Sequence, residues 1–146
     1  MKRKKDKGFT LVELIVVIAI MAVLVGVLAP QFIKYVENSR RATDVSSAES
    51  IRSAILADVA DQRAPFGSNQ VTAVSIDSSH LPSSIAEPPT IKATSNNGQN
   101  FQAAWNADKG TCDVYDASGS YLLTDPKGGQ DYKNQESAGS YTKTVS

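Results

Sequence analysis

A single carboxylate, Glu13, stands at the head of an apolar run that contains no other charged side chain until Lys34. Insertion scales put the cost of a charge at the centre of a bilayer-spanning helix at about 2.5–3.5 kcal/mol. A carboxylate in such a segment therefore indicates a function. Its chemistry would be electrostatic, because a carboxylate in an apolar core is costly alone and much less costly when it is paired with a cation.

A short basic block lies immediately before the apolar run. Five of the first eight residues are basic and one is acidic. The block ends at Gly8, and Phe9 and Thr10 follow it. Positive charge keeps this end of an apolar segment in the cytoplasm, so the C-terminal part of the chain is expected on the outside.

The apolar run is long enough to cross a membrane as a helix. Residues 14–29 carry no polar side chain, and the addition of residues 9–13 gives a segment, 9–29, of 21 residues. A helix of that length extends roughly 30 Å, which is the thickness of one hydrocarbon core. The sequence therefore predicts a transmembrane helix at 9–29.

Three kinds of N-terminal segment fit a basic block followed by an apolar run. A secretory signal peptide would be cut after Ala29, but Pro30 follows, and proline is a poor residue just after a cleaved bond. An ordinary single-pass anchor has a suitable length, but it gives no reason for Glu13 or for the pair Gly8-Phe9. The third kind is cut on the cytoplasmic side after Gly8 and keeps its apolar segment. The sequence favours this third kind.

The helical pattern continues beyond residue 29 but becomes one-sided, over residues 30–64. Apolar residues recur there at spacings that reduce to threes and fours, which predicts one buried stripe. The stripe consists of Ile33, Val36, Val45, Ala48, Ile51, Ile55 and Val59. The residues between them are largely charged and include Arg41, Asp44 and Asp58. A helix lying on a sheet fits this pattern better than a coiled coil, because the charges interrupt a clean heptad.

Two prolines bear on this predicted helix. Pro30 removes one backbone hydrogen bond and should kink the helix. Pro65 disfavours helix at Ala64, so the helix is expected to run from Phe9 to about Arg63.

The region 65–125 reads as loops and three or four short antiparallel strands. Strands are predicted at 101–105, 111–115 and 121–124, and residues 71–76 are either a fourth strand or part of a loop. Hairpin-type loops at 107–110 and 116–119 separate the first three. The apolar face of such a sheet must pack against another element, and we expect the apolar stripe of the helix to pack on it. The fold class is therefore α+β: one long N-terminal helix packed on a small antiparallel sheet.

The segment 126–146 is rich in Gly, Ser, Lys and Gln, and it is predicted to be a poorly ordered or loosely packed polar tail. Trp105 is expected in the core or on a sheet face, and Cys112 is expected to be a buried hydrophobic residue that shares one strand face with Val114. His80 lies in a Ser- and Pro-rich loop and is expected to be solvated.

Composition argues against several classes of function. The 146 residues have a net charge of zero, and the region after the basic block is slightly acidic, so no nucleic-acid site is indicated. One cysteine and one histidine offer almost no material for a zinc site or for His-based catalysis. No nucleophile–base pair or Gly-rich phosphate loop is present. The sequence therefore predicts neither an enzyme nor a cofactor.

Calcium is the metal ion that the acidic loops of this chain could bind, because oxygen-rich loops can coordinate it. The candidate acids are Asp108, Asp113, Asp116, Asp125 and Asp131. Turns favour aspartate for local hydrogen bonding alone, and no ligand spacing repeats here. We therefore predict no metal site.

The N-terminal residues resemble those of type IV prepilins and the related pseudopilins. Gly8, Phe9, Thr10, Glu13 and Pro30 all match the family pattern, and the resemblance is specific over about residues 4–40. It implies that residues 1–8 are a leader peptide, which a prepilin peptidase removes between Gly8 and Phe9. It also implies N-methylation of Phe9, and a role for Glu13 and Thr10 in subunit assembly.

The resemblance further implies a structural subunit of a type IV pilus-like filament that polymerises through its N-terminal helix. The implied partners are other copies of the chain, the prepilin peptidase, the cytoplasmic membrane and the pilus assembly platform. The subunit would lie in the cytoplasmic membrane before assembly and in an extracellular filament afterwards. Motility, adhesion, secretion or DNA uptake would be properties of the assembly.

Two alternatives stay open on the sequence alone. The chain can be a pseudopilin of a type II secretion or competence machine, which shares the same leader and helix. It can also be a membrane-anchored binding module that never polymerises.

The predicted cleavage can be tested on the native protein. The mature chain should begin at Phe9 and carry one methyl group on its α-amine. Intact-mass analysis together with N-terminal sequencing measures both. A mature start at Pro30, or a retained Met1, would contradict the prediction.

Overall fold

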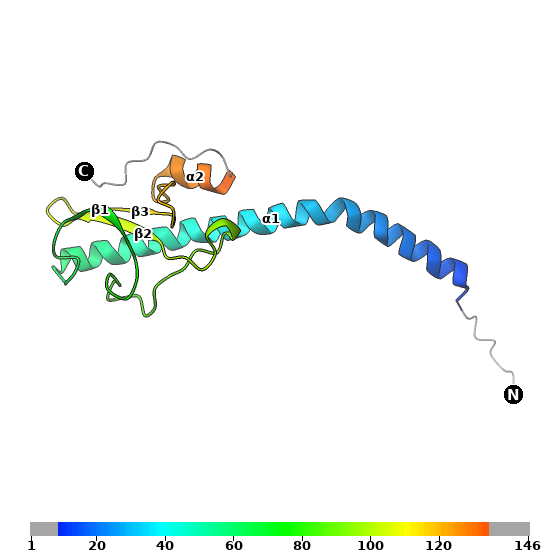
Figure 1. Ribbon diagram of the computed structural model, residues 1–146, viewed down its shortest axis with the longest axis horizontal. Coiled ribbons are helices and arrows are strands. Elements are labelled where there is room, and N and C mark those ends of the chain that lie inside the picture. The colour runs from blue at the N-terminus through cyan, green and yellow to red at the C-terminus, as the bar shows by residue number, and fades with distance from the viewer. Residues whose placement is uncertain (1–8, 135–146) are drawn as a thin grey trace, which may run out of the picture. The chain divides into compact units, whose positions relative to one another are not determined.

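A computed structural model describes residues 9–134. The chain divides into an N-terminal unit, Met1–Val36, and a C-terminal unit, Glu37–Ser146. Helix α1, Leu11–Ala60, begins in the first unit and ends in the second (Figure 1). The helix contains Pro30, and its kink there remains a prediction.

Helix α1 ends slightly earlier than the position predicted from Pro65. Gln62 adopts the left-handed conformation with φ 52°. The amide of Gln62 donates to the carbonyl of Val59 (3.1 Å), and the amide of Arg63 donates to the carbonyl of Asp58 (2.9 Å). These two bonds form a Schellman motif, which satisfies carbonyl groups at the end of the helix. The predicted end, at about Arg63, lies three residues beyond the observed one. The left-handed position after the helix is occupied by a glutamine rather than by the glycine that usually marks a helix end.

The C-terminal unit contains a three-stranded antiparallel sheet in the order β1-β2-β3. The strands are β1 (Gln70–Ser75), β2 (Gln102–Asn106) and β3 (Thr111–Tyr115). In the β2–β3 hairpin, Trp105 lies opposite Cys112, and the connecting turn uses Gly110 at φ 64°. Residues 70–75 are thus a strand, and the α+β architecture of a helix on a small sheet is confirmed.

The predicted strand at 121–124 is wrong. Only one isolated bridge, Tyr115 to Leu122, joins this segment to the sheet. The carboxylate of Asp116 accepts the amides of Tyr121 (2.7 Å) and Ser118 (3.2 Å), and these bonds hold the chain in a turn immediately after β3. Two backbone bonds make the bridge: the amide of Leu123 donates to Val114 (2.8 Å), and the amide of Asp116 donates to Tyr121 (3.1 Å). The pairing extends no further, and the bonds of Asp116 are typical of aspartate in turns.

The core of the C-terminal unit lies between the sheet and the second half of α1. The helix contributes Ala48, Ile51, Ile55 and Val59, which confirms this part of the predicted stripe. The sheet contributes several buried residues, among them Trp105, Cys112 and Val114. Tyr115 points into a second, smaller cluster with Ala104 on the opposite face, because side chains alternate between the faces of a strand.

Cys112 is buried, as expected. Burial raises the pKa of its thiol to about 12, so the group stays protonated at neutral pH. Because the thiolate is the reactive form, this thiol is a poor nucleophile in the folded protein.

The prediction of a loose tail is wrong for residues 126–134, which form a second helix, α2 (Pro126–Asn134). The Asp125 carboxylate accepts the amides of Lys127 and Gly128, both at 3.0 Å, and so caps the helix start. Tyr132 is only 1% exposed and fixes α2 to the core. One buried aromatic residue in a polar segment was too weak a signal to predict this helix. The rest of the predicted tail, 135–146, lies outside the described residues.

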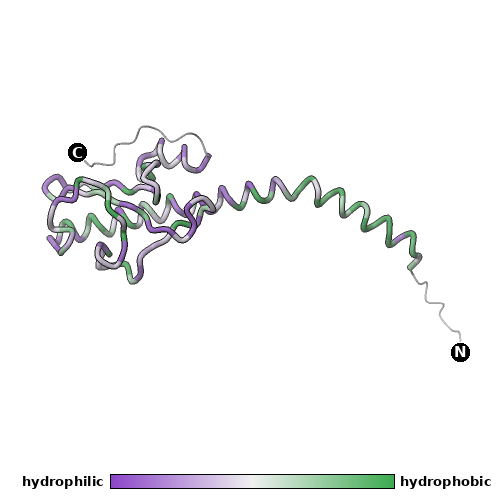
Figure 2. The backbone as a smooth tube through the Cα atoms, in the orientation of Figure 1, coloured by the Kyte–Doolittle hydropathy of each residue, from purple (hydrophilic) through white to green (hydrophobic). Residues whose placement is uncertain are grey.

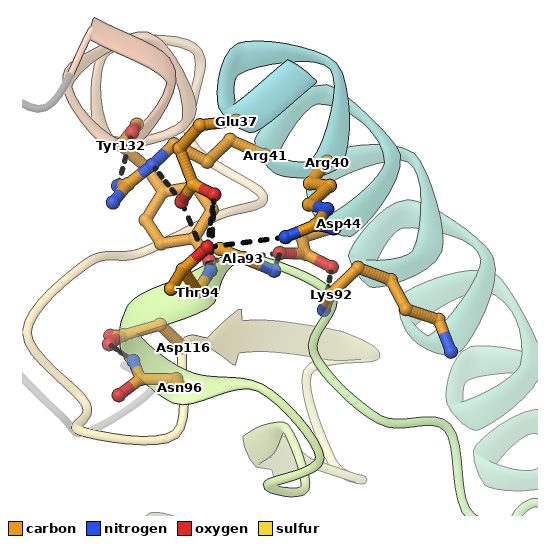
Figure 3. A network of polar contacts seen from close by, with 10 residues as sticks. All are labelled: Glu37, Arg40, Arg41, Asp44, Lys92, Ala93, Thr94, Asn96, Asp116 and Tyr132. Atoms are coloured by element: carbon orange, nitrogen blue, oxygen red, sulfur yellow. Dashed lines mark hydrogen bonds and ion pairs between the residues drawn. The ribbon is translucent and has the colours of Figure 1, made fainter. Parts of the chain in front are cut away.

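A buried carboxylate on α1 joins three parts of the C-terminal unit (Figure 3). Asp44 is fully buried and accepts the backbone amides of Lys92 (2.7 Å) and Ala93 (2.9 Å). It also accepts the hydroxyl of Tyr132 at 3.0 Å. Burial and the nearby Asp44 carboxylate raise the pKa of Tyr132, so its hydroxyl remains a donor.

Arg41 completes this junction from one turn away. Its guanidinium donates to the carbonyl of Tyr132 (2.9 Å) and to Glu37 (3.1 Å), and it lies 4.9 Å from the centre of the Tyr132 ring. Glu37 in turn accepts the amide and hydroxyl of Thr94. Arg41 and Asp44 interrupt the heptad pattern in the sequence. In the structure both are buried, and their hydrogen bonds connect α1 to the loop before β2 and to α2.

Replacement of Asp44 by Ala should destabilise the C-terminal unit by about 3 kcal/mol or more. Three donors lose their partner, and two of them, the Ala93 amide and the Tyr132 hydroxyl, are in buried bonds. An unsatisfied buried group costs about 1–3 kcal/mol. Urea unfolding of the full chain in detergent, followed by fluorescence of the single, buried Trp105, measures the loss. Ser46→Ala, at an exposed position of the same helix, is the control and should change stability by less than about 0.5 kcal/mol. Equal stability of the two variants would contradict the assigned role of Asp44.

Candidate functional site

The start of α1 brings together two of the residues that the sequence singled out. One Glu13 carboxylate oxygen, Oε2, accepts the backbone amide of Thr10 at 2.8 Å and the Thr10 hydroxyl at 2.7 Å. In return, the Thr10 hydroxyl oxygen accepts the backbone amide of Glu13 at 3.3 Å. This reciprocal arrangement is a capping box, with Thr10 as the N-cap and Glu13 at the third helical position.

The capping box gives Glu13 a local partner that the sequence analysis missed. The sequence did contain the signal for it. A Thr followed three residues later by a Glu, just before an apolar run, is the pattern of a capping box. Only Oε2 takes part in these bonds; among the described contacts, Oε1 has none. A cation can therefore approach the carboxylate without displacing every bond that Thr10 makes.

The other predicted site residues lie as follows. Phe9 is 85% exposed and directly precedes the N-cap. Gly8, on the other side of the predicted scissile bond, lies outside the described residues. Pro30 lies inside α1, seventeen residues beyond Glu13. The structure therefore joins Thr10 and Glu13, with Phe9 next to Thr10 in the chain, and leaves Pro30 apart. The roles of all these residues in cleavage and assembly remain predictions.

The surface that follows the capping box is apolar on every side. Figure 2 shows the first half of α1 as a continuous hydrophobic segment. Its large side chains are at least half exposed; these are Leu11, Val12, Leu14, Ile15, Val16, Val17, Ile18, Ile20, Met21, Val23, Leu24, Val25, Val27 and Leu28. Among the described residues, α1 is the one helix long and apolar enough to cross a membrane. A helix that is hydrophobic all round belongs in a bilayer or in a bundle of similar helices.

Three of the acidic residues considered for calcium have other partners in the C-terminal unit. Asp116 and Asp125 hold turn and helix-cap amides, and Asp108 accepts the side-chain amide of Asn69. Asp113 is half-buried, and its pKa is raised because burial disfavours its charge. No group of three His, Cys, Asp or Glu that could hold a metal occurs within residues 9–134.

His80 is less solvated than predicted. Its side chain is 30% exposed, and its ring centre lies 6.1 Å from that of Trp105. The Nδ1 atom lies 3.0 Å from the Ser79 hydroxyl, which donates to Asp77. The hydrogen bonds to Ser79 lower the pKa of Asp77, so this carboxylate is charged at neutral pH. These contacts stabilise a loop and give the histidine a packing role.

Comparison with known proteins agrees with the N-terminal geometry. Residues 3–29 match the family model described as the prokaryotic N-terminal methylation motif. This motif belongs to the leader of type IV pilins and pseudopilins, so the resemblance seen in the sequence is confirmed.

One curated relative is similar over the same part of the chain. It is named prepilin peptidase-dependent protein A, from Clostridium perfringens (strain 13 / Type A), and it is 56% identical over 41 residues. The match covers 28% of this chain and 29% of the relative, so it says nothing of the remainder of either protein. No solved structure matches the chain.

The capping box predicts a specific effect of substitution at Thr10. Thr10→Ala removes the hydroxyl and should weaken the first turn of α1 by about 1 kcal/mol, whereas Thr10→Ser should be close to neutral. The amides of Glu13 and Leu14 bond to the hydroxyl and the carbonyl of Thr10. Their hydrogen exchange, in the full chain in detergent, should be roughly fivefold faster in the Ala variant. Equal exchange in both variants would show that the capping box does not stabilise the helix start.

Proposed function

We propose that the chain is a prepilin-type structural subunit that is processed after Gly8 and polymerises through α1 into a type IV pilus-like filament. The observation that carries this proposal is a carboxylate, Glu13, at the head of a helix whose following surface is apolar and exposed on every side. The methylation motif over residues 3–29 and the name of the Clostridium relative support cleavage by a prepilin peptidase and methylation of Phe9.

Before assembly, the subunit is held in the cytoplasmic membrane by the first half of α1. This segment is apolar enough to cross the bilayer, and the basic block before it keeps the leader in the cytoplasm. In the filament, the same surface is covered by the corresponding helices of other subunits. The C-terminal unit, with its own core, then forms the outer layer.

Cleavage after Gly8 creates the cation that Glu13 needs. The new α-amine of Phe9 has a reference pKa of about 7.7–8.0 and is largely charged at neutral pH. In the filament, Glu13 of one subunit meets the Phe9 amine of its neighbour. Because an unpaired carboxylate in an apolar core is costly, this contact fixes the register between subunits more than it adds stability.

The capping box defines the state of Glu13 before that contact forms. In the single subunit, Thr10 supplies the hydrogen bonds of the carboxylate within one turn of the helix. A cap of this kind is worth about 0.5–2 kcal/mol, which is small beside the penalty of a buried, unpaired charge. The carboxylate can therefore exchange part of its bonding to Thr10 for the amine of the next subunit.

A pseudopilin of a secretion or competence machine would share the processing, the anchor and the Glu13 contact. The proposed role is structural, with no enzymatic step and no cofactor.

The role of Glu13 is tested by Glu13→Gln and Glu13→Ala in cells that express the processed chain. Filaments sheared from the surface should be lost or sharply reduced, because neither side chain can pair with the Phe9 amine as an anion. The subunit should still be cleaved, inserted in the membrane and folded outside. Electron microscopy counts the filaments, and immunoblotting of membranes measures the subunit pool.

The matched control is Glu49→Gln, an exposed carboxylate on the same helix within the C-terminal unit. It should leave the filament yield unchanged. Filaments at the wild-type level from both Glu13 variants, with processing intact, would remove the assigned role of Glu13. A complete absence of filaments from the wild-type chain would favour a module that never polymerises.

A further inference from the structure

The exposed apolar surface of α1 extends beyond the segment predicted to cross the membrane. After Pro30, three large side chains remain largely exposed: Phe32 (66%), Ile33 (68%) and Tyr35 (71%). The change comes at Val36, which is half-buried, and at Glu37, which bonds to Thr94. The two aromatic residues thus lie between the apolar segment and the first residue of the C-terminal unit.

These residues have the chemistry of a membrane–water interface. The twenty residues from Leu11 to Pro30 extend roughly 30 Å, which fills one hydrocarbon core. Phe32 and Tyr35 follow within the next turn and a half, and their spacing of three places them on one helix face. Lys34, which lies between them, is exposed and is the first cation after the apolar run. Aromatic rings collect at the headgroup level of bilayers, and a lysine near a helix end reaches the phosphates there.

We propose that Phe32, Lys34 and Tyr35 form an interfacial anchor that binds the phospholipid headgroups of the outer leaflet of the membrane. The proposal rests on the membrane-inserted subunit of the proposed function and adds a second element to it. The basic leader holds one end of the helix, and the interfacial anchor holds the other. Together they fix the depth of the helix in the bilayer.

Charge favours headgroups over a second copy of the chain as the occupant of this surface. Lys34 needs an anionic partner, and lipid phosphates supply one. The apolar segment of another copy contains no acidic side chain between residues 14 and 36. The next acid, Glu37, already accepts Thr94 and Arg41 within its own chain. Headgroups therefore satisfy the lysine and both rings at once.

The anchor determines where Glu13 lies. Glu13 and Tyr35 are 22 residues apart, which is roughly 33 Å along a helix. With Tyr35 among the outer headgroups, Glu13 lies at the inner boundary of the hydrocarbon core. A carboxylate there can keep contact with water and headgroups, so it avoids the cost of the bilayer centre. The interfacial anchor thus fixes the depth of Glu13 in the bilayer and keeps its carboxylate hydrated until assembly.

A depth measurement in vesicles tests this proposal. The full chain, in a Cys112→Ala background, carries a spin label at a cysteine placed at Val16, one turn beyond Glu13. It is reconstituted at a high lipid-to-protein ratio in vesicles of phosphatidylethanolamine and phosphatidylglycerol. The balance of collisions with oxygen and with a water-soluble nickel complex gives the depth of the label.

The test variant is the double substitution Phe32→Ser with Tyr35→Ser. Without the rings, the apolar stretch is shorter at its outer end, so the helix should move outward by about two residues, or roughly 3 Å. The label should therefore lie deeper in the hydrocarbon. The matched control, Phe32→Tyr with Tyr35→Phe, keeps two aromatic rings and should leave the depth unchanged.

Equal depth of the label in the test and control variants would overturn the interfacial anchor. A shift that disappears when the protein is diluted further in lipid would also overturn it, because it would make a second copy the occupant. Neither outcome depends on filaments. Failure of the anchor is therefore distinguishable from failure of the proposed function, which is judged by the filament yield of the Glu13 variants.

Discussion

One helix has to satisfy two environments, and the structure depends on where it changes from one to the other. Up to Tyr35, the exposed side chains of α1 are largely apolar and lie on every side of the helix. From Glu37 onward, only one face is apolar, and it packs on the sheet. A helix apolar all round needs lipid or other helices, and a one-sided helix needs a partner surface in water. The change therefore falls where the chain divides into its two units, Met1–Val36 and Glu37–Ser146.

The C-terminal unit secures its end of α1 by polar contacts as well as by the core. Asp44 and Arg41 lie on α1 near the start of the unit, where the apolar stripe is still incomplete. Their bonds reach the loop at Lys92 and the buried Tyr132 of α2. A buried hydrogen-bonded carboxylate adds little net stability but strongly disfavours any packing that leaves it unpaired. These contacts thus specify the position of α2 more than they strengthen the core.

The sequence predicted those elements whose signals are local. The part of the α1 stripe from Ala48 to Val59 and the β2–β3 hairpin follow from periodicity and from a turn with Gly110, and both were found. Ile33, predicted at the start of the stripe, is 68% exposed, because the C-terminal unit that covers the stripe begins only at Glu37. Helix α2 was missed because its position depends on distant contacts, which Tyr132 makes with Asp44 and Arg41. At the candidate site, the residues were recognised by their types, but the bonds between Thr10 and Glu13 were not, although their spacing of three was visible.

The assembly role that we propose for Glu13 is compatible with its capping role, because the two roles differ in free energy. As a partner of Thr10, Glu13 completes a capping box that stabilises the helix start by about 1 kcal/mol. As a partner of a neighbouring amine, it would avoid the much larger cost of a buried, unpaired charge. The weaker bond holds the side chain in a defined position while it remains near water. In the proposed filament, the surrounding apolar helices would make the stronger partner necessary, so the environment of Glu13 would determine whether it bonds to Thr10 or to the amine.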